Sequence, residues 1–342
     1  MKKRITSAIA LIVFSIALVV ASFISTGLNN TSGIKTGVAI SANIKNSTDV
    51  SADKDGANNT SVTVAAVTVD EKGRIIACEI DVLETTINFN ASGVITTDLT
   101  AEVLTKTERG DEYGMKNAEA NRIQKEWYEQ VNAFEDYCIG KTAEQIMGIT
   151  VNSETGLPED ADLAAGCTMH PAQFQYVVAE AIANASVTGA NADDKLGLAI
   201  STKLTDSKDA TDTDDGLAEV AATIAVTTVD GEGKVTSAIL DAVQADVTFD
   251  KTGKITNDVT ADVLTKNEKK DEYGMRKYSS IQKEWYEQAA SFAKYCVGKT
   301  ADEILGISVN QETGFVDDLA TSCTMHPGNF QYVVAEAIGY AQ

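Results

Sequence analysis

The segment Ile76-Ala-Cys-Glu-Ile-Asp-Val82 places an apolar side chain at every second position, with small or polar side chains between them. This period of two is the pattern of a half-buried β-strand. Turn-forming residues bound the strand on both sides, as Asp70-Glu-Lys-Gly73 before it and Asn90-Ala-Ser-Gly93 after it. Alternating runs joined by tight turns predict consecutive strands of an antiparallel sheet.

Two more strands are expected before this segment. Apolar residues alternate from Val38 to Ile44, and a second apolar run extends from Val62 to Val69 after a polar loop. The second run changes phase in its middle, which favours a β-bulge there.

Helical periodicity replaces this pattern further along the chain. Apolar residues recur on one helical face from Ile123 to Cys138, and the stripe stops at Gly140. Thr142 opens the capping-box sequence Thr-Ala-Glu-Gln, which predicts the start of a short helix. Pro171 suits the first turn of a last helix. A sheet followed by several helices makes this unit α+β.

The whole pattern occurs twice in the chain. Trp127 recurs as Trp285 within the identical hexapeptide Lys-Glu-Trp-Tyr-Glu-Gln. A repeat of this length is a duplicated domain, because solenoid repeats run only ~20–50 residues. We therefore expect two tandem homologous domains, 34–187 and 195–342, joined by a linker at 188–194.

The first 33 residues differ in composition from the rest. Three basic residues at positions 2–4 precede an uncharged, mostly apolar run from Ile5 to Ile24. This pattern matches a signal sequence, and the run is also long enough to span a bilayer as a helix. We expect residues 1–33 to be a signal sequence or membrane anchor with a linker. The domains would then lie on the extracytoplasmic face of the cell membrane, or be secreted after cleavage.

The net charge of −22 at pH 7 makes the chain strongly acidic. A surface of that sign repels phosphate backbones, which argues against nucleic acid as a partner. The sequence contains no phosphate-binding Walker loop, no serine-hydrolase elbow and no zinc-protease motif. These features favour a protein without the common hydrolytic machinery.

Each repeat ends with a polar cluster just before its last apolar helix. The clusters read Asp162-Leu-Ala-Ala-Gly-Cys-Thr-Met-His-Pro171 and Asp318-Leu-Ala-Thr-Ser-Cys-Thr-Met-His-Pro327, and they contain both histidines of the chain. The start of a helix attracts phosphate through its free amide groups and its dipole. A hydroxyl placed there is suited to carry a phosphoester, and the helix that contains Trp127 adds aromatic surface for a flat ring.

The sequence Asp162-x-x-Ala-Gly-Cys-Thr168 resembles the flavinylation sequence Asp-x-x-Ser-Gly-Ala-Thr of FMN-binding domains. The upstream segment Val69-Asp-Glu-Lys-Gly-Arg-Ile75 is similar to the Asp-Gly-Lys-Ile segment of that family. In the family, an exported flavin transferase moves FMN from FAD onto the threonine hydroxyl. The resemblance covers most of each repeat. It implies two covalent FMN groups per chain, on Thr168 and Thr324, with Asp162 and Asp318 in the sequence that the transferase recognises.

The repeats depart from the family sequence near the threonine. Cys167 and Cys323 replace an alanine, and His170 and His326 replace the usual hydroxyl residue. The second repeat also has Thr321-Ser322 in place of Ser-Gly. We include these residues in the expected cofactor site, where histidine would contact the phosphate or protonate the reduced ring. Capping of the helix is the alternative role for histidine. The repeated segment Asp-Glu-Tyr-Gly-Met adds the last expected pocket residues, which are Tyr113, Met115, Tyr273 and Met275.

Together these features predict an electron-transfer flavoprotein more than a stand-alone enzyme. The flavin carries the redox chemistry, and the protein supplies attachment and tuning. We expect electrons to arrive from a membrane dehydrogenase or quinol and to leave to an extracellular acceptor.

Several alternatives stay open at this point. Cys138, Cys167 and His170 would suit zinc or copper. Cys138 with Cys167, and likewise Cys296 with Cys323, would form a disulfide in an oxidising compartment. The same duplicated fold would also serve as a non-redox surface module for binding or structure. Trp127 would line the flavin ring or, as we favour, pack in the core with its neighbouring tyrosine at the rim.

Overall fold

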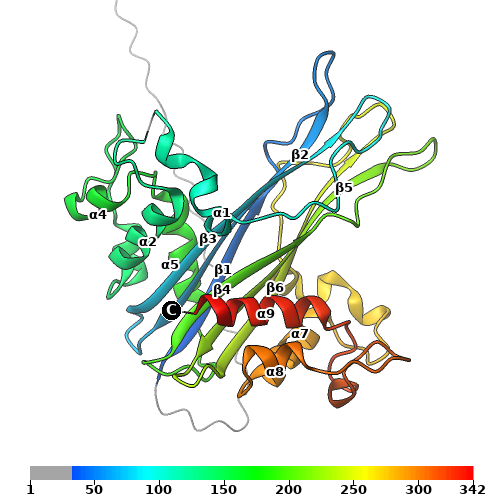
Figure 1. Cartoon of the computed structure of the whole chain (residues 1–342). Coiled ribbons are helices and arrows are strands. Elements are labelled where there is room, and N and C mark those ends of the chain that lie inside the picture. The colour runs from blue at the N-terminus through cyan, green and yellow to red at the C-terminus, as the bar shows by residue number, and fades with distance from the viewer. Residues whose placement is uncertain (1–32, 120, 342) are drawn as a thin grey trace, which may run out of the picture.

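The computed structural model describes residues 33–119 and 121–341. The predicted signal sequence or anchor lies outside the described residues. Among the residues that are described, no helix is long and apolar enough to cross a membrane. The described chain forms two similar halves, each with an antiparallel sheet followed by helices (Figure 1). This confirms the predicted α+β class and the tandem arrangement.

Each repeat begins with a three-stranded antiparallel sheet whose strands follow chain order. The strands of the first repeat are β1 (Lys35–Asn43), β2 (Gly56–Val69) and β3 (Ile75–Phe89), and those of the second are β4 (Lys195–Lys203), β5 (Gly216–Val229) and β6 (Val235–Phe249). The predicted turn at 70–73 is confirmed, because the Gly73 amide donates to the Asp70 carbonyl at 3.0 Å. Gly73 has a φ of 71°, a conformation that glycine adopts without strain.

The bulge predicted in the middle of β2 is wrong. The register with β3 runs without a shift from Gly56 to Thr68, and it shifts only between Thr68 and Val69. The consecutive apolar residues have another cause, which is burial of both faces of the strand. Val64 belongs to a core shared with the second sheet, whereas Val67 packs under the helices. A strand covered on both faces has a continuous apolar sequence.

Helices fill the second half of each repeat, as predicted. The first repeat has α1 (Lys106–Arg109), α2 (Trp127–Cys138), α3 (Ala143–Met147), α4 (Ala161–Gly166) and α5 (Ala172–Asn184). The second repeat has α6 (Lys266–Lys269), α7 (Trp285–Cys296), α8 (Ala301–Leu305) and α9 (Gly328–Tyr340). Short 3-10 turns occur at Gly110–Tyr113, Met115–Asn117, Lys270–Tyr273, Met275–Lys277 and Asp317–Leu319, the last in place of a second α4.

The helix predicted from Ile123 begins instead at Trp127. Glu126 caps it, with its own amide donating to Glu129 Oε2 at 2.8 Å. Gln124 has a φ of 52°, which no helical residue adopts. The cap therefore starts the helix one turn later than the apolar stripe suggested, and α7 begins in the same way.

The other helix boundaries follow the predicted signals. Thr142 caps α3, and its Oγ1 accepts the amide of Gln145 in a capping box. Pro171 was expected as the first residue of the last helix, but it is the N-cap, the residue just before α5. Gly140 follows α2 with a φ of 78°, as the stop signal required.

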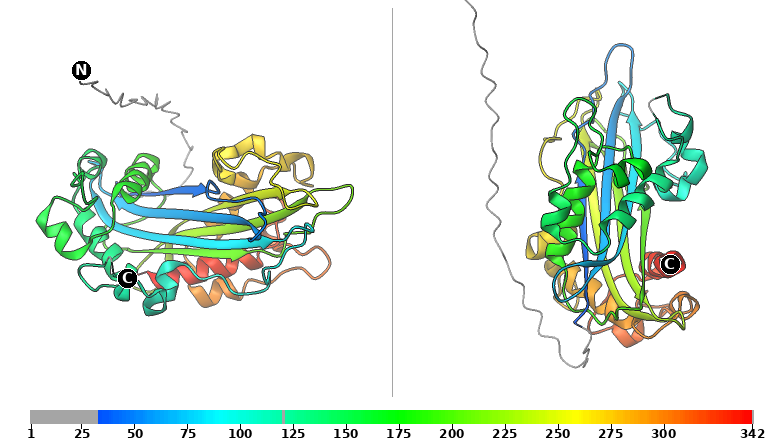
Figure 2. Two further views of the ribbon diagram at one scale, coloured as in Figure 1. Left: turned by 90° about the horizontal axis from the view of Figure 1, so that it is seen from above. Right: turned by 90° about the vertical axis from the view of Figure 1, so that its left-hand side faces the viewer.

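The two sheets pack face to face around one hydrophobic core that belongs to both repeats (Figure 2). Strand β1 contacts β6, β2 contacts β5 and β3 contacts β4, so the contacts are reciprocal. Helices α2 and α5 pack on the first sheet, and α7 and α9 pack on the second, as seen at the two sides of Figure 1. Each sheet thus lies between its own helices and the other sheet.

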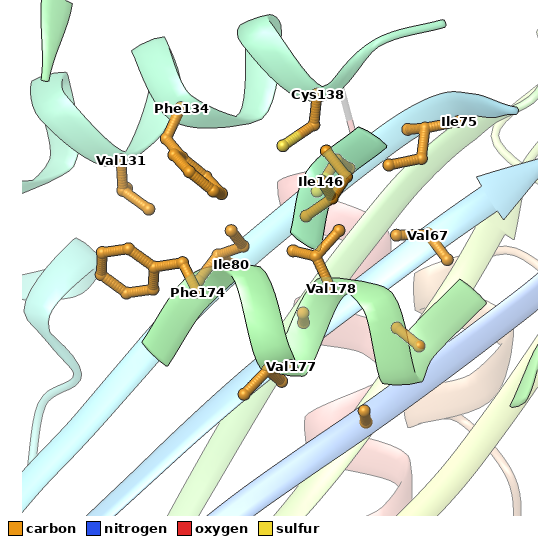
Figure 3. Packing of buried hydrophobic residues seen from close by; sticks show 14 of the residues in the cluster. Val67, Ile75, Ile80, Val131, Phe134, Cys138, Ile146, Phe174, Val177 and Val178 are labelled. Atoms are coloured by element: carbon orange, nitrogen blue, oxygen red, sulfur yellow. The ribbon is translucent and has the colours of Figure 1, made fainter. Parts of the chain in front are cut away.

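Each repeat also has a core of its own between sheet and helices. In the first repeat, Phe134 of α2 and Phe174 of α5 lie close to each other near Ile80 of β3 (Figure 3). The centroids of the two phenylalanine rings are 5.7 Å apart. Trp127 packs edge-on against Phe174 and is only 3% exposed. The favoured interpretation of Trp127 as a core residue is therefore confirmed.

The segment predicted as a linker, 188–194, lies against both repeats. Thr188 Oγ1 donates to Thr36 Oγ1 of β1 at 3.1 Å, and Asp194 accepts the hydroxyl of Thr236 in β6 at 2.6 Å. Ala190 between them is fully buried. The repeats are therefore joined by packing as well as by the chain.

Candidate functional site

Thr168 lies in the short segment between α4 and α5, where its amide and its hydroxyl share one partner. The amide donates to Gln130 Oε1 at 2.9 Å, and Oγ1 donates to the same oxygen at 3.1 Å. In the second repeat, Thr324 donates to Gln288 Oε1 in both ways, at 2.8 and 3.3 Å. Both threonines are half-buried. The two predicted attachment residues therefore have the same local environment.

Gln130 is fully buried on α2, and the other end of its side-chain amide is also bonded. Nε2 donates to the Lys125 carbonyl at 3.1 Å and lies 3.8 Å from Met115 Sδ. Gln130 therefore links a predicted pocket residue, Met115, to the predicted attachment residue. The second repeat has the same arrangement, formed by Gln288, Lys283 and Met275, with an added bond to Ser279 Oγ.

A hollow of about 560 Å³ opens next to this segment in the first repeat. Its walls are mainly aromatic or apolar, and Lys106 and His170 contribute the charged and titratable groups. The structure therefore brings three predicted site residues, Tyr113, Met115 and His170, to one cavity. Trp127, Met169 and Phe174 complete most of its wall.

Lys106, at the start of α1, places a positive charge at this hollow. Its Nζ lies 5.2 Å from the ring centroid of Tyr113 and 5.8 Å from that of Trp127, within the range of a cation–π interaction. Nζ also pairs with Glu84 Oε1 at 2.8 Å, on the more exposed side. The lysine is thus held between two aromatic rings and a carboxylate.

In the second repeat, Lys266 Nζ lies over Tyr273 at 4.8 Å and over Trp285 at 5.4 Å. Gln244 stands at the position that corresponds to Glu84. Its Nε2 donates to Glu219 Oε1 at 2.9 Å, and its Oε1 accepts the Tyr273 hydroxyl at 3.4 Å. The predicted pocket residue Tyr273 therefore lies beside a lysine for which an amide replaces the carboxylate that pairs with Lys106.

The second repeat has a hollow at another place, 271–284, of about 580 Å³ and lined by charged and polar side chains. Arg276 there pairs with Asp271 at 3.0 Å and with Glu287 at 3.1 Å. Tyr278, which is 89% exposed, lies close to it in sequence. None of Lys266, Tyr273, Met275 and Trp285, the counterparts of residues that line the first hollow, lines this one. The polar hollow is therefore not the counterpart of the aromatic one.

The two histidines have different neighbours. His170 is exposed at the rim of the hollow, and its Nδ1 accepts the amide of Ala172, the first residue of α5, at 3.3 Å. His170 is therefore a hydrogen-bonded group at the surface beside the start of α5, whose N-cap is Pro171. His326 is also exposed, and its ring centroid lies 6.1 Å from that of Phe315.

The motif cysteines lie in the cores of their repeats. Cys167 and Cys323 are buried among the helices. Burial raises the pKa of the Cys167 thiol to about 11 and shifts that of Cys323 in the same direction. A thiol with a raised pKa is a poor nucleophile at neutral pH. The five cysteines are free thiols in the structure, without either of the disulfides considered from the sequence.

The metal interpretation finds no support in this geometry. Across the described ranges, no group of three or more His, Cys, Asp or Glu side chains is placed to hold a metal ion. Cys138 is fully buried in the helical core, whereas His170 is exposed.

The predicted recognition aspartates have unequal contacts. Asp162 is exposed on α4, and its neighbour Asp160 both caps that helix and accepts the Tyr137 hydroxyl at 2.9 Å. Asp318 itself accepts the hydroxyl of Tyr295 at 2.8 Å. The difference follows from the replacement of α4 by a 3-10 turn in the second repeat. Both aspartates remain accessible to a partner protein.

The hollow of the first repeat suits a flavin by its chemistry. Aromatic faces can accept a flat ring, and a lysine can offset negative charge. Gln130 contacts both Met115, which lines the hollow, and the hydroxyl of Thr168, the predicted attachment residue. The sequence analysis missed Lys106, Gln130 and Phe174. The signal for them was repetition, since each recurs in the second repeat, as Lys266, Gln288 and Phe330.

Comparison with known proteins finds limited similarity. No family model matches the chain, and no solved structure matches it. Among curated proteins, the chlorophenol reductase of Desulfitobacterium hafniense is 32% identical over 100 residues. That region is 26% of this chain and 30% of the reductase, so the chain spans less than a third of the length of this relative.

Proposed function

We propose that this protein is an extracytoplasmic electron carrier that holds FMN covalently on Thr168 and Thr324. The hollow of the first repeat carries the proposal, because aromatic walls and a cation meet there and because Met169, which lines it, follows the attachment residue Thr168. A flat ring with a phosphate tail requires this combination, since the ring stacks on aromatic faces and the phosphate needs an anchor.

The residues of the hollow have separate tasks in this proposal. Tyr113 offers a surface to the ring, and Met115, Met169 and the edge of the buried Trp127 form the wall around it. The Lys106 ammonium stabilises negative charge near the ring, which favours the reduced form. When bound, FMN supplies one- and two-electron transfer.

Attachment requires an exported flavin transferase with FAD, as the resemblance to FMN-binding domains implies. Thr168 Oγ1 attacks the phosphorus on the riboflavin side of FAD. The Oγ1–P bond forms, the P–O bond to the adenylate breaks, and AMP leaves. The hydroxyl proton passes to a base of the transferase. Asp162 and Asp318 are exposed, so a transferase can reach both.

The partial likeness to a protein named as a reductase supports a redox role. The donor in this proposal is a membrane dehydrogenase or quinol, and the acceptor is extracellular. Residues 1–33 would supply the signal sequence or anchor. Two flavins on one chain would give the protein two redox centres.

A non-redox surface module is the second candidate. The polar hollow of the second repeat favours it, because Arg276, Lys277 and several carboxylates there offer charged groups to a ligand. A module of this kind would bind its ligand without flavin.

The test is expression of the full chain together with an exported flavin transferase. We expect flavin absorbance that stays with the protein after acid precipitation and that bleaches on chemical reduction. A known flavinylated protein labelled in the same cells is the control. Colourless protein beside a labelled control would contradict the proposal and favour the non-redox module.

A further inference from the structure

We infer that Gln130 and Gln288 are positioning residues for FMN attachment, an inference that rests on the proposed function. Each glutamine accepts both the amide and the hydroxyl of one threonine through a single oxygen. A threonine hydroxyl otherwise rotates freely about its C–O bond. The shared oxygen ties the direction of the hydroxyl to the backbone of the same residue.

The side-chain amide of Gln130 has only one satisfactory orientation. Its Nε2 donates to the Lys125 carbonyl at 3.1 Å. With the amide turned over, two oxygens would face each other there, and two donors would face each other at Thr168. Gln130 is fully buried, so water does not compete for these bonds. Oε1 is thereby presented to Thr168 in a fixed direction.

This direction suits attack on phosphorus. Because the Thr168 hydroxyl hydrogen points at Gln130, the lone pairs of Oγ1 point away from it. Orientation of the attacking atom is a large part of the barrier in such transfers. An amide oxygen does not take the proton, so Gln130 positions the nucleophile and the transferase supplies the base. The bond from the Thr168 amide survives esterification and holds the product in the same place.

The glutamine–threonine pair occurs in both repeats, although the segment before the threonine differs between them. The segment before the threonine is the helix α4 in the first repeat and a 3-10 turn in the second. The glutamine oxygen nevertheless lies at nearly the same distances from the threonine amide and hydroxyl in both. The common element is the acceptor threonine.

The test compares attachment at the two threonines of one molecule. Gln130→Met keeps the length and volume of the side chain but removes both acceptor bonds. The full chain is incubated with purified transferase and FAD, and peptide mass mapping follows the adduct at each threonine over time. We expect the adduct on Thr168 to form roughly tenfold more slowly, the factor for one lost orienting hydrogen bond. The rate at Thr324 should not change, and Gln288→Met should reverse the pattern.

Gln175→Met is the matched control. Gln175 is a buried glutamine of α5 whose Nε2 donates to the carbonyls of Ile146 and Ile149 at 2.9 and 3.0 Å, away from the acceptor threonine. Gln175→Met should lower the thermal unfolding temperature about as much as Gln130→Met does. It should leave the attachment rates at Thr168 and Thr324 unchanged.

Three results would overturn the inference. A wild-type rate at Thr168 in Gln130→Met would show that the glutamine does not position the hydroxyl. Equal slowing at Thr168 and Thr324 would show an effect on the shared fold. An unmodified wild-type chain would overturn the proposed function together with the inference, and this result differs from the other two because no variant is needed to see it.

Discussion

Phe89 stacks on Phe249, its own counterpart in the other repeat, with ring centroids 4.0 Å apart and planes 1° from parallel. A residue that meets its counterpart lies on a twofold axis, as in an isologous dimer. Reciprocal bonds surround this axis. The Ile95 amide donates to Asp209 Oδ1 at 2.8 Å, and the counterparts of these two residues form the same bond at 2.7 Å. The chain is thus built as a dimer within one polypeptide.

This relationship predicts that the repeats unfold together. Phe89→Ala would open a cavity in the shared core and lower the free energy of unfolding by about 3–5 kcal/mol. Trp127 and Trp285 provide one fluorescent reporter in each repeat, so Trp127→Phe and Trp285→Phe backgrounds isolate the signals. We expect coincident urea transitions in both backgrounds. Separate midpoints would show that the shared core does not couple the repeats.

Asn58 should contribute more than its size suggests. Its Nδ2 donates across the shared core to the carbonyls of Ala218 and Ala245, at 2.8 and 2.9 Å. Asn58→Ala leaves both carbonyls without this donor. Because a buried polar group is then unsatisfied, we expect the free energy of unfolding to fall by about 1–3 kcal/mol. Thr86→Ala removes an exposed hydroxyl bond and should change stability by less than about 0.5 kcal/mol. Equal effects in urea denaturation would contradict this ranking.

Stability should fall as pH rises toward neutrality. Burial, followed by the charges of Asp81 and Asp136, raises the pKa of Glu79 to about 7, and burial also raises that of Glu135. The folded state therefore holds protons that the unfolded chain has released above its ordinary pKa of 4.5. The stabilisation from Glu79 is complete below pH 4.5, and it is lost as the pH rises through about 7, the pKa of Glu79 in the folded state.

Glu79→Gln stays neutral throughout and should flatten this fall, by on the order of 1–3 kcal/mol across the window. Glu112→Gln, at an exposed carboxyl, is the control. Urea denaturation at a series of pH values measures both. An unchanged slope in Glu79→Gln would mean that this carboxyl does not titrate in the window.

Lys106 should tune the flavin of the first repeat. Its ammonium lies over Tyr113 and Trp127 at the hollow, so Lys106→Met removes a charge that favours the reduced ring. A loss of about 1–2 kcal/mol corresponds to a reduction potential lower by roughly 20–40 mV for two electrons. Lys251→Met, at an exposed surface pair, should leave the potential unchanged. Equal potentials in the wild type and Lys106→Met would contradict the assigned task.

Much of the fold could be predicted because its signals are local. Alternation over Ile76–Val82, the turn at 70–73 and the capping box at Thr142 each depend on neighbouring residues alone. The shared core could not be predicted, because no single repeat shows what covers the second face of its sheet. The start of α2 was misplaced because the cap at Glu126 outweighed the apolar stripe.

Part of the site could be predicted because its residues recur in both repeats. Tyr113, Met115 and His170 were grouped by repetition, and the structure places them around one hollow. Lys106 and Gln130 were missed because their roles depend on side-chain directions that no spacing rule supplies. Attachment of FMN stays a prediction.

The central claim is covalent FMN on two threonines, and intact mass of the protein purified from its native host tests it most directly. We predict a gain of two FMN phosphoesters, reduced to one by Thr168→Ala or by Thr324→Ala and to none by both together. Thr168→Ser should retain the adduct, because it keeps the hydroxyl. An unmodified mass for the wild type, in a host that labels other flavinylated proteins, would contradict the account.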